Sequence, residues 1–147
     1  MAKLSDSEIT AALQAHMEPG EELRQWAVGI TPPGAGAIVA SSLRASATGM
    51  ASTGMSMLSW MVGLTDKRLI ALHIKGLRDG EVLGSLSFDL SRLAREPGRV
   101  KSGWMQTRLR IDWPDQPWQA QFNRLFASGH RAQALEIGAA ISGASAP

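Results

Sequence analysis

The chain has 147 residues, of which 44% are hydrophobic and 19% are charged, a size and composition typical of one globular domain. It contains no cysteine, which excludes disulfides, thiolate zinc sites, iron–sulfur clusters and thiol nucleophiles. Fifteen Lys and Arg against thirteen Asp and Glu leave a formal net charge of +2, too small an excess to indicate a nucleic-acid partner.

The first residues predict a helix within 1–18. Ser5 and Glu8 have the spacing of a capping box, and Pro19 followed by Gly20 ends the pattern. The residues after Met1 lack the apolar run of a secretory signal. We therefore expect a cytoplasmic protein.

A strand is predicted at Leu23–Ile30, and an unusual segment, 34–62, follows it. This segment is rich in Ala, Gly, Ser, Thr and Met, and Arg44 is its only charged residue. Small and apolar residues recur in it at alternating intervals of four and three positions, which predicts that they line one side of a helix, called the seam here. The seam comprises Gly36, Ala40, Leu43, Ala47, Met50, Gly54, Met57 and Met61. Residues 45–65 are uncharged and long enough to cross a bilayer, but their Gly, Ser and Thr content argues against a membrane span.

The apolar residues then alternate with a period of two, which predicts half-buried strands. Ile70, Leu72 and Ile74 are expected to face inward, with Ala71 and His73 on the outer side. Counting Leu23–Ile30 and a short piece at 60–64, we expect about seven strands, the others near 70–75, 82–90, 100–104, 106–113 and 118–122.

A C-terminal helix is predicted over 128–141, and a flexible tail over 142–147. The apolar stripe of the helix comprises Ala134, Leu135, Gly138 and Ile141, and should dock onto the sheet.

Thr65, Asp66 and Arg68 form the turn signature in the run from Leu64 to Ile70, which resembles the strand–turn–strand motif of bacterial pleckstrin-homology-like and GRAM domains. Met17–Leu23, with its Gly-Glu pair, is similar to the segment that leads into the first strand of those families, and Val82–Leu90 to a later strand.

The resemblance implies an α+β fold, a small antiparallel β-barrel or sandwich of about seven strands. It would form one domain over 1–147, with an N-terminal helix, the Met-rich insertion after the first strand and a C-terminal capping helix. The insertion departs from the short hairpin loop typical of the family, and Arg44 is its only basic residue, whereas lipid-binding members carry Lys and Arg there.

No pattern of catalytic chemistry is apparent. His16, His73 and His130 have no neighbouring residues typical of a hydrolase triad or a metal site. Gly34 and Gly36 are not followed by a phosphate-binding motif. We expect no catalytic residue, metal or cofactor, and therefore no enzyme. The alternative of an enzyme or ligand carrier would require polar groups inside the barrel, and every inward position predicted above is apolar or small.

We expect an interaction module that docks to a copy of itself or to another protein through the uncharged residues 36–61. Small residues and Met suit a closely packed interface. The candidate contacts are Leu43, Ala47, Met50, Gly54, Met57, Trp60 and Met61. Trp60 stands out because the other four tryptophans fall at inward strand positions.

The alternative is a peripheral membrane protein. In that case the Met- and Trp-rich segment would enter the interface while basic residues meet anionic lipid. The candidate anion or lipid contacts are Arg44, Lys67, Arg68, Arg108 and Arg110. Arg108 and Arg110 would point outward together from one strand, and a solvated sheet face is the simpler interpretation of that pair.

Overall fold

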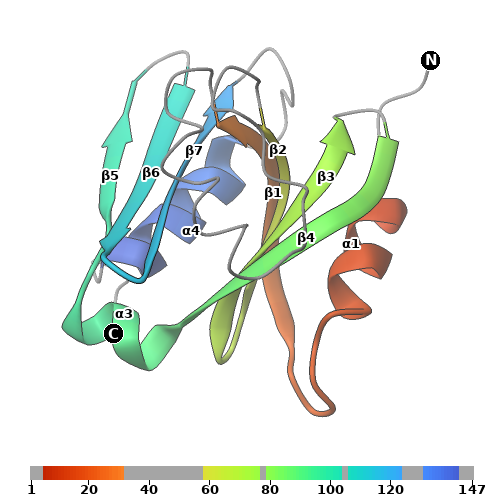
Figure 1. Cartoon of the computed structure of the whole chain (residues 1–147), viewed down its shortest axis with the longest axis horizontal. Coiled ribbons are helices and arrows are strands. Elements are labelled where there is room, and N and C mark those ends of the chain that lie inside the picture. The colour runs from red at the N-terminus through yellow and green to blue at the C-terminus, as the bar shows by residue number, and fades with distance from the viewer. Residues whose placement is uncertain (1–4, 32–57, 77–78, 104–105, 124–130, 143–147) are drawn as a thin grey trace.

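A computed structural model of the chain describes residues 5–31, 58–76, 79–103, 106–123 and 131–142. Across these residues, seven antiparallel strands form one sheet in the order β4-β3-β2-β1-β7-β6-β5 (Figure 1). The strands are β1 (Leu23–Thr31), β2 (Leu58–Thr65), β3 (Arg68–Gly76), β4 (Asp79–Asp89), β5 (Arg99–Ser102), β6 (Gln106–Trp113) and β7 (Gln116–Asn123). The helices are α1 (Asp6–Gln14), α3 (Leu90–Arg95) and α4 (Arg131–Ser142). The predicted α+β class is confirmed.

The N-terminal capping box forms as predicted. The Ser5 hydroxyl accepts a hydrogen bond from the Glu8 amide at 3.2 Å, and the Ser5 amide donates to the Glu8 carboxylate at 3.1 Å. These bonds satisfy two backbone donors that a helix start leaves unpaired. The helix ends at Gln14, earlier than predicted.

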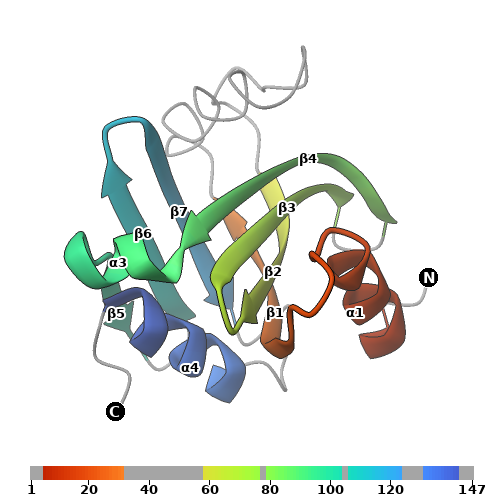
Figure 2. The ribbon, with the colours of Figure 1, turned by 90° about the horizontal axis from the view of Figure 1, so that it is seen from below.

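The sheet buries apolar side chains on both faces. On one face, α1 places Ile9 and Leu13 over an outer core that comprises Val28, Met61, Ile70, Leu72 and Ile74. On the other face, α4 covers an inner core that is shared by the two halves of the sheet, β1 to β4 and β5 to β7. Figure 2 shows the two helices apart, α1 beside the β3 and β4 side and α4 beside β5.

Because β3 is covered on both faces, the predicted outward position of His73 is wrong. Ile70, Leu72 and Ile74 pack towards α1, so His73 points to the opposite side and lies 5.4 Å from the Trp60 ring. His73 is only 5% exposed, and burial lowers the pKa of its imidazole.

The inner core is a continuous set of rings from both halves of the sheet. Trp60 on β2 lies 5.8 Å from Trp118 on β7, with the two rings nearly perpendicular. Trp118 lies 5.7 Å from Phe88, and Phe88 lies 5.5 Å from Trp113. Edge-to-face and tilted packing of this kind holds the two halves of the sheet together.

The alternation predicted for β4 does not hold along its full length. The pairing of β4 with β3 shifts between His73 and Ile74, so Val82 joins the outer core while Leu86 and Phe88 face the inner core. An irregularity of this kind moves a strand's side chains to the opposite face. Leu90, predicted to end the strand, instead begins α3.

The helix α4 is held against β5 and β6 by a close backbone approach. Ala134, Ile137 and Ile141 are buried, whereas Leu135, predicted in the buried stripe, is 38% exposed. The Gly98 amide donates to the Ile141 carbonyl at 2.8 Å. A Cβ at Gly98 would lie 2.2 Å from Ile141 Cγ2 and 2.6 Å from the Arg110 carbonyl oxygen.

Gly98→Ala should therefore lower the free energy of unfolding by about 1 to 3 kcal/mol, because a methyl group there overpacks the helix–sheet contact. The matched control is Gly76→Ala, because a Cβ at Gly76 meets nothing within 4 Å. Chemical denaturation of both variants measures the difference. Equal stability of the two variants would contradict this close approach.

His73→Phe should make stability less sensitive to mild acid. The folded pKa of His73 lies below its ordinary value of 6.5, so unfolding is favoured as the pH falls below 6.5, where the unfolded chain takes up the proton. Stability measured from pH 7 to pH 5 should fall less steeply in the variant than in the wild type. The exposed His16, changed to Phe, is the control, and identical slopes for all three proteins would contradict the burial of His73.

Candidate functional site

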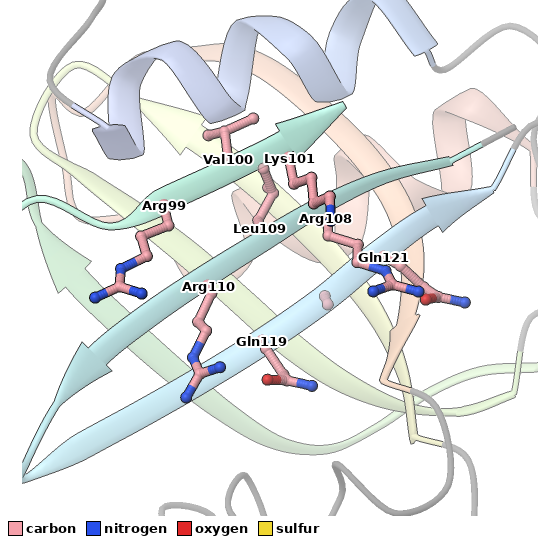
Figure 3. A pocket seen from close by; sticks show the side chains of 9 residues that line it. Arg99, Val100, Lys101, Arg108, Leu109, Arg110, Gln119 and Gln121 are labelled. Carbon is pink, nitrogen blue, oxygen red and sulfur yellow. The ribbon is translucent and has the colours of Figure 1, made fainter. Parts of the chain in front are cut away.

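The outer face of β5, β6 and β7 carries a groove of about 570 Å³. We call it the cationic groove. It is defined by six polar side chains, Arg99, Lys101, Arg108, Arg110, Gln119 and Gln121 (Figure 3).

The inner core dictates which residues reach this face. Along β6, Leu109 and Ile111 are buried in the inner core, so Arg108 and Arg110, which alternate with them, must point outward. Along β7, Trp118 and Ala120 are buried, and the same alternation sends the glutamine side chains to the groove.

The strand register arranges the six side chains in two rows. Arg99 lies opposite Arg110, which in turn lies opposite Gln119. Lys101 lies opposite Arg108, which lies opposite Gln121. Neighbouring strands are about 5 Å apart and alternate residues of one strand about 7 Å apart, so four cations occupy a small rectangle flanked by two amides.

One carboxylate partly offsets these charges. Asp112 Oδ1 lies 2.6 Å from Arg110 Nε, and Asp112 Oδ2 lies 3.7 Å from Arg99 Nε. Four cations and this carboxylate give the groove a net charge of +3. Because the side chains of Arg99 and Arg110 are 80% and 52% exposed, their pairing with Asp112 contributes little to stability.

The structure brings together two of the five residues predicted as anion contacts. Arg108 and Arg110 lie in the groove, whereas Lys67 and Arg68 belong to the β2–β3 turn, and Arg44 lies outside the described residues. The predicted site missed Arg99, Lys101 and the two glutamines. Their outward direction follows from strand alternation once β5, β6 and β7 are known, but the register that aligns β5 with β6 and β7 was not predicted.

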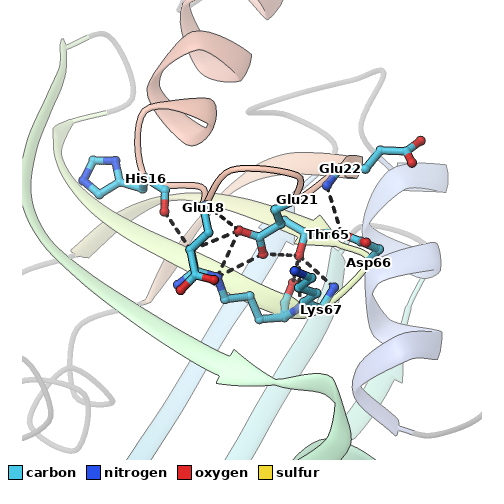
Figure 4. A network of polar contacts seen from close by, with 8 residues as sticks. His16, Glu18, Glu21, Glu22, Thr65, Asp66 and Lys67 are labelled. Atoms are coloured by element: carbon cyan, nitrogen blue, oxygen red, sulfur yellow. Dashed lines mark hydrogen bonds and ion pairs between the residues drawn. The ribbon is translucent and has the colours of Figure 1, made fainter.

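The turn signature forms a separate network with the loop that precedes β1 (Figure 4). The Thr65 hydroxyl accepts from the amides of Lys67 and Arg68, each at 3.0 Å, and donates to Glu21 Oε2 at 2.5 Å. Asp66 Oδ1 accepts from the Glu22 amide at 2.9 Å. The two segments that carry the family resemblance are therefore in direct contact.

Arg68 completes this network. Its Nε and Nη2 donate to the two carboxylate oxygens of Glu21 at 3.0 and 3.1 Å, and Nη2 also donates to the His16 carbonyl at 2.8 Å. The Glu21 side chain is fully buried. The Arg68 guanidinium is therefore engaged in an internal pair, which corrects its predicted placement as a lipid contact. Hydrogen bonding to Arg68 is the main reason that the pKa of Glu21 falls to about 2, and it outweighs desolvation.

The predicted self-association contacts are placed differently from expectation where the structure describes them. Trp60 and Met61 lie in β2 and are 0% and 1% exposed, so neither is available to a partner surface. Trp60 Nε1 donates to the Thr31 hydroxyl at 2.8 Å. Met61 also contradicts the predicted helical seam, since it lies in β2, which begins at Leu58. The other contacts, Leu43, Ala47, Met50, Gly54 and Met57, lie outside the described residues.

Three further observations bear on the alternatives. Within the described ranges, no three His, Asp or Glu side chains gather as a metal site would require. None of the helices in those ranges has the length and apolar character needed to cross a membrane. On the inner-core side of the sheet, His73 Nδ1 and Trp118 Nε1 are buried without a hydrogen-bond partner among the described residues, which corrects the expectation of a wholly apolar interior.

Glu21→Gln should lower the free energy of unfolding by about 2 to 3 kcal/mol at neutral pH, because it removes a buried carboxylate paired with Arg68. The folded pKa of about 2 lies below the ordinary value of 4.5, so this stabilisation is present above pH 4.5 and is lost as the pH falls towards 2. Denaturation across that range measures it.

The matched control is Glu22→Gln, the same change at the adjacent exposed residue. It should alter stability by less than about 0.5 kcal/mol. If the stability difference between wild type and Glu21→Gln stayed constant from pH 7 to pH 2, the ion pair would not have the role assigned to it.

Comparison with known proteins found a distant structural match. No family model matches the chain, and no curated protein matches it. Among solved structures, the chain is similar to "The hSac2 domain from human phosphoinositide phosphatase Sac2", at 13% identity and a TM-score of 0.42. That match covers 80% of this chain and 68% of the other. It is a distant likeness of fold.

Proposed function

We propose that this chain is a non-enzymatic interaction module of the pleckstrin-homology-like type that binds an anionic partner through the cationic groove. The observation that carries the proposal is the grouping of four cations and one carboxylate on an outward sheet face. Such a concentration of like charge attracts an anionic surface and speeds its association.

The family assignment within this proposal is supported by two features. The Thr65-Asp66-Lys67-Arg68 turn joins β2 to β3, as in the family motif that it resembles. The order of elements along the chain ends with the helix α4, which packs on the sheet.

The cost of like-charge crowding also favours binding over a purely structural role. Lys101 lies directly opposite Arg108, and like charges at opposite positions destabilise a strand pair. The core beneath them needs neither charge, because it is formed by the alternate, apolar residues. An anionic partner would remove the repulsion.

Docking through residues 36–61 is a separate proposal, to a second copy or to another protein. Its support is now confined to composition, since Trp60 and Met61 are core residues. The membrane alternative is weakened for the same reason, because the buried Trp60 cannot act as an aromatic anchor at a membrane interface. The groove is therefore the surface on which we base the function.

Fluorescein-labelled polyglutamate is a suitable general probe. Anisotropy titration at low salt should show binding that weakens as salt is added. Changing both Lys101 and Arg108 to Glu should weaken it by about tenfold or more, since a loss of about 1.4 kcal/mol corresponds to a factor of ten.

The matched control changes Arg24 and Arg95 to Glu, two exposed arginines outside the groove that give the same change in net charge. It should weaken binding far less. Equal losses in the two double variants would mean that overall charge, and not the groove, attracts the probe. If the wild type bound neither polyglutamate nor any other anionic probe, the proposed function would be overturned.

A further inference from the structure

We infer that the cationic groove takes an extended acidic peptide segment of a protein partner, with carboxylates at alternate positions. The inference rests on the proposed function and names the chemistry of its partner. It depends on the register of β5, β6 and β7 and on the behaviour of Asp112.

The spacing of the cations matches an extended chain. Arg108 and Arg110 are two residues apart on β6, and Arg99 and Lys101 are two residues apart on β5. Side chains two residues apart on any extended segment lie on one face, about 7 Å from each other. A segment that runs parallel to these strands can therefore place one carboxylate at each row of the groove.

Asp112 shows how a carboxylate sits in the first row. It contacts Arg110 from its own strand at 2.6 Å and Arg99 from the neighbouring strand at 3.7 Å. The second row repeats the arrangement with Lys101 opposite Arg108, also from β5 and β6. Charge-assisted hydrogen bonds to carboxylate oxygens are the contacts that both rows are built to make.

The glutamines complete the match to a peptide. Gln119 and Gln121 extend the two rows onto β7 and are half-buried at the groove's side. A carboxamide both donates and accepts hydrogen bonds, so it suits the alternating amides and carbonyls of a peptide backbone.

A lipid surface fits this groove less well. The site is hollowed, whereas a bilayer surface is broad, and membrane-binding faces combine basic residues with exposed apolar ones. Leu135 is the large apolar side chain exposed among the described residues, and it lies on α4, outside the groove.

The test compares two labelled peptides of the same composition by anisotropy. One has glutamate at every second position with serine between, and its isomer has the glutamates in one block. The alternating peptide should bind at least about fivefold more tightly to the wild-type chain, and the preference should vanish when Arg108 and Arg110 are both changed to Ala.

Asp112→Asn provides a second variant that should gain affinity. The substitution removes the internal carboxylate that competes for Arg99 and Arg110. The alternating peptide should therefore bind to the variant at least about threefold more tightly than to the wild type. Because Asp112 is exposed, the substitution should leave the fold intact, which circular dichroism checks. Unchanged or weaker binding would contradict competition for the same site.

The outcomes separate this inference from the proposed function. Equal binding of the two peptides, with polyglutamate still bound through the groove, overturns the alternating segment and leaves the anionic partner. Sedimentation with phosphatidylserine vesicles, without binding of either peptide, overturns the peptide in favour of a lipid surface. Failure of polyglutamate, peptides and vesicles alike overturns the proposed function itself.

Discussion

The alternation of side chains across β5, β6 and β7 is the constraint from which the groove follows. Leu109, Ile111 and Trp118 are held in the inner core, so their sequence neighbours have no alternative to the opposite face. Hydrogen bonding between the strands then fixes which outward residues lie side by side. The cationic groove is thus positioned by hydrophobic packing on its far side, and not by interactions among its own charges.

The two halves of the sheet use their outer faces differently. The outer face of β1 to β4 is occupied by α1, with Ile9 and Leu13 fully buried there. The Glu21–Arg68 pair joins the loop after α1 to the β2–β3 turn, so that half is committed to structure. On the β5 to β7 half, the groove is formed by outward cations and amides, with the Asp112 carboxylate beside them. Arginine therefore has two roles, buried pairing at Arg68 and an outward charge at Arg108.

Local patterns in the sequence predicted much of this fold. The capping box at Ser5, the turn at Thr65 and the alternation of β6 each depend on residues close together in the chain. What failed depended on long-range packing. His73 was expected outside because one covered face was assumed for β3, and Trp60 was expected at a surface because its neighbours are rich in Met. The groove needed the register between three strands, which local periodicity does not contain.

The most direct test of the cationic groove is a two-dimensional amide NMR titration of the full chain with the alternating acidic peptide. The account predicts saturable, salt-sensitive shifts that concentrate on Arg99–Ser102, Gln106–Trp113 and Gln116–Asn123. Amides of α1 and of the β2–β3 turn should move little. Shifts centred on α1 or β2, with β5 to β7 unaffected at saturation, would contradict it.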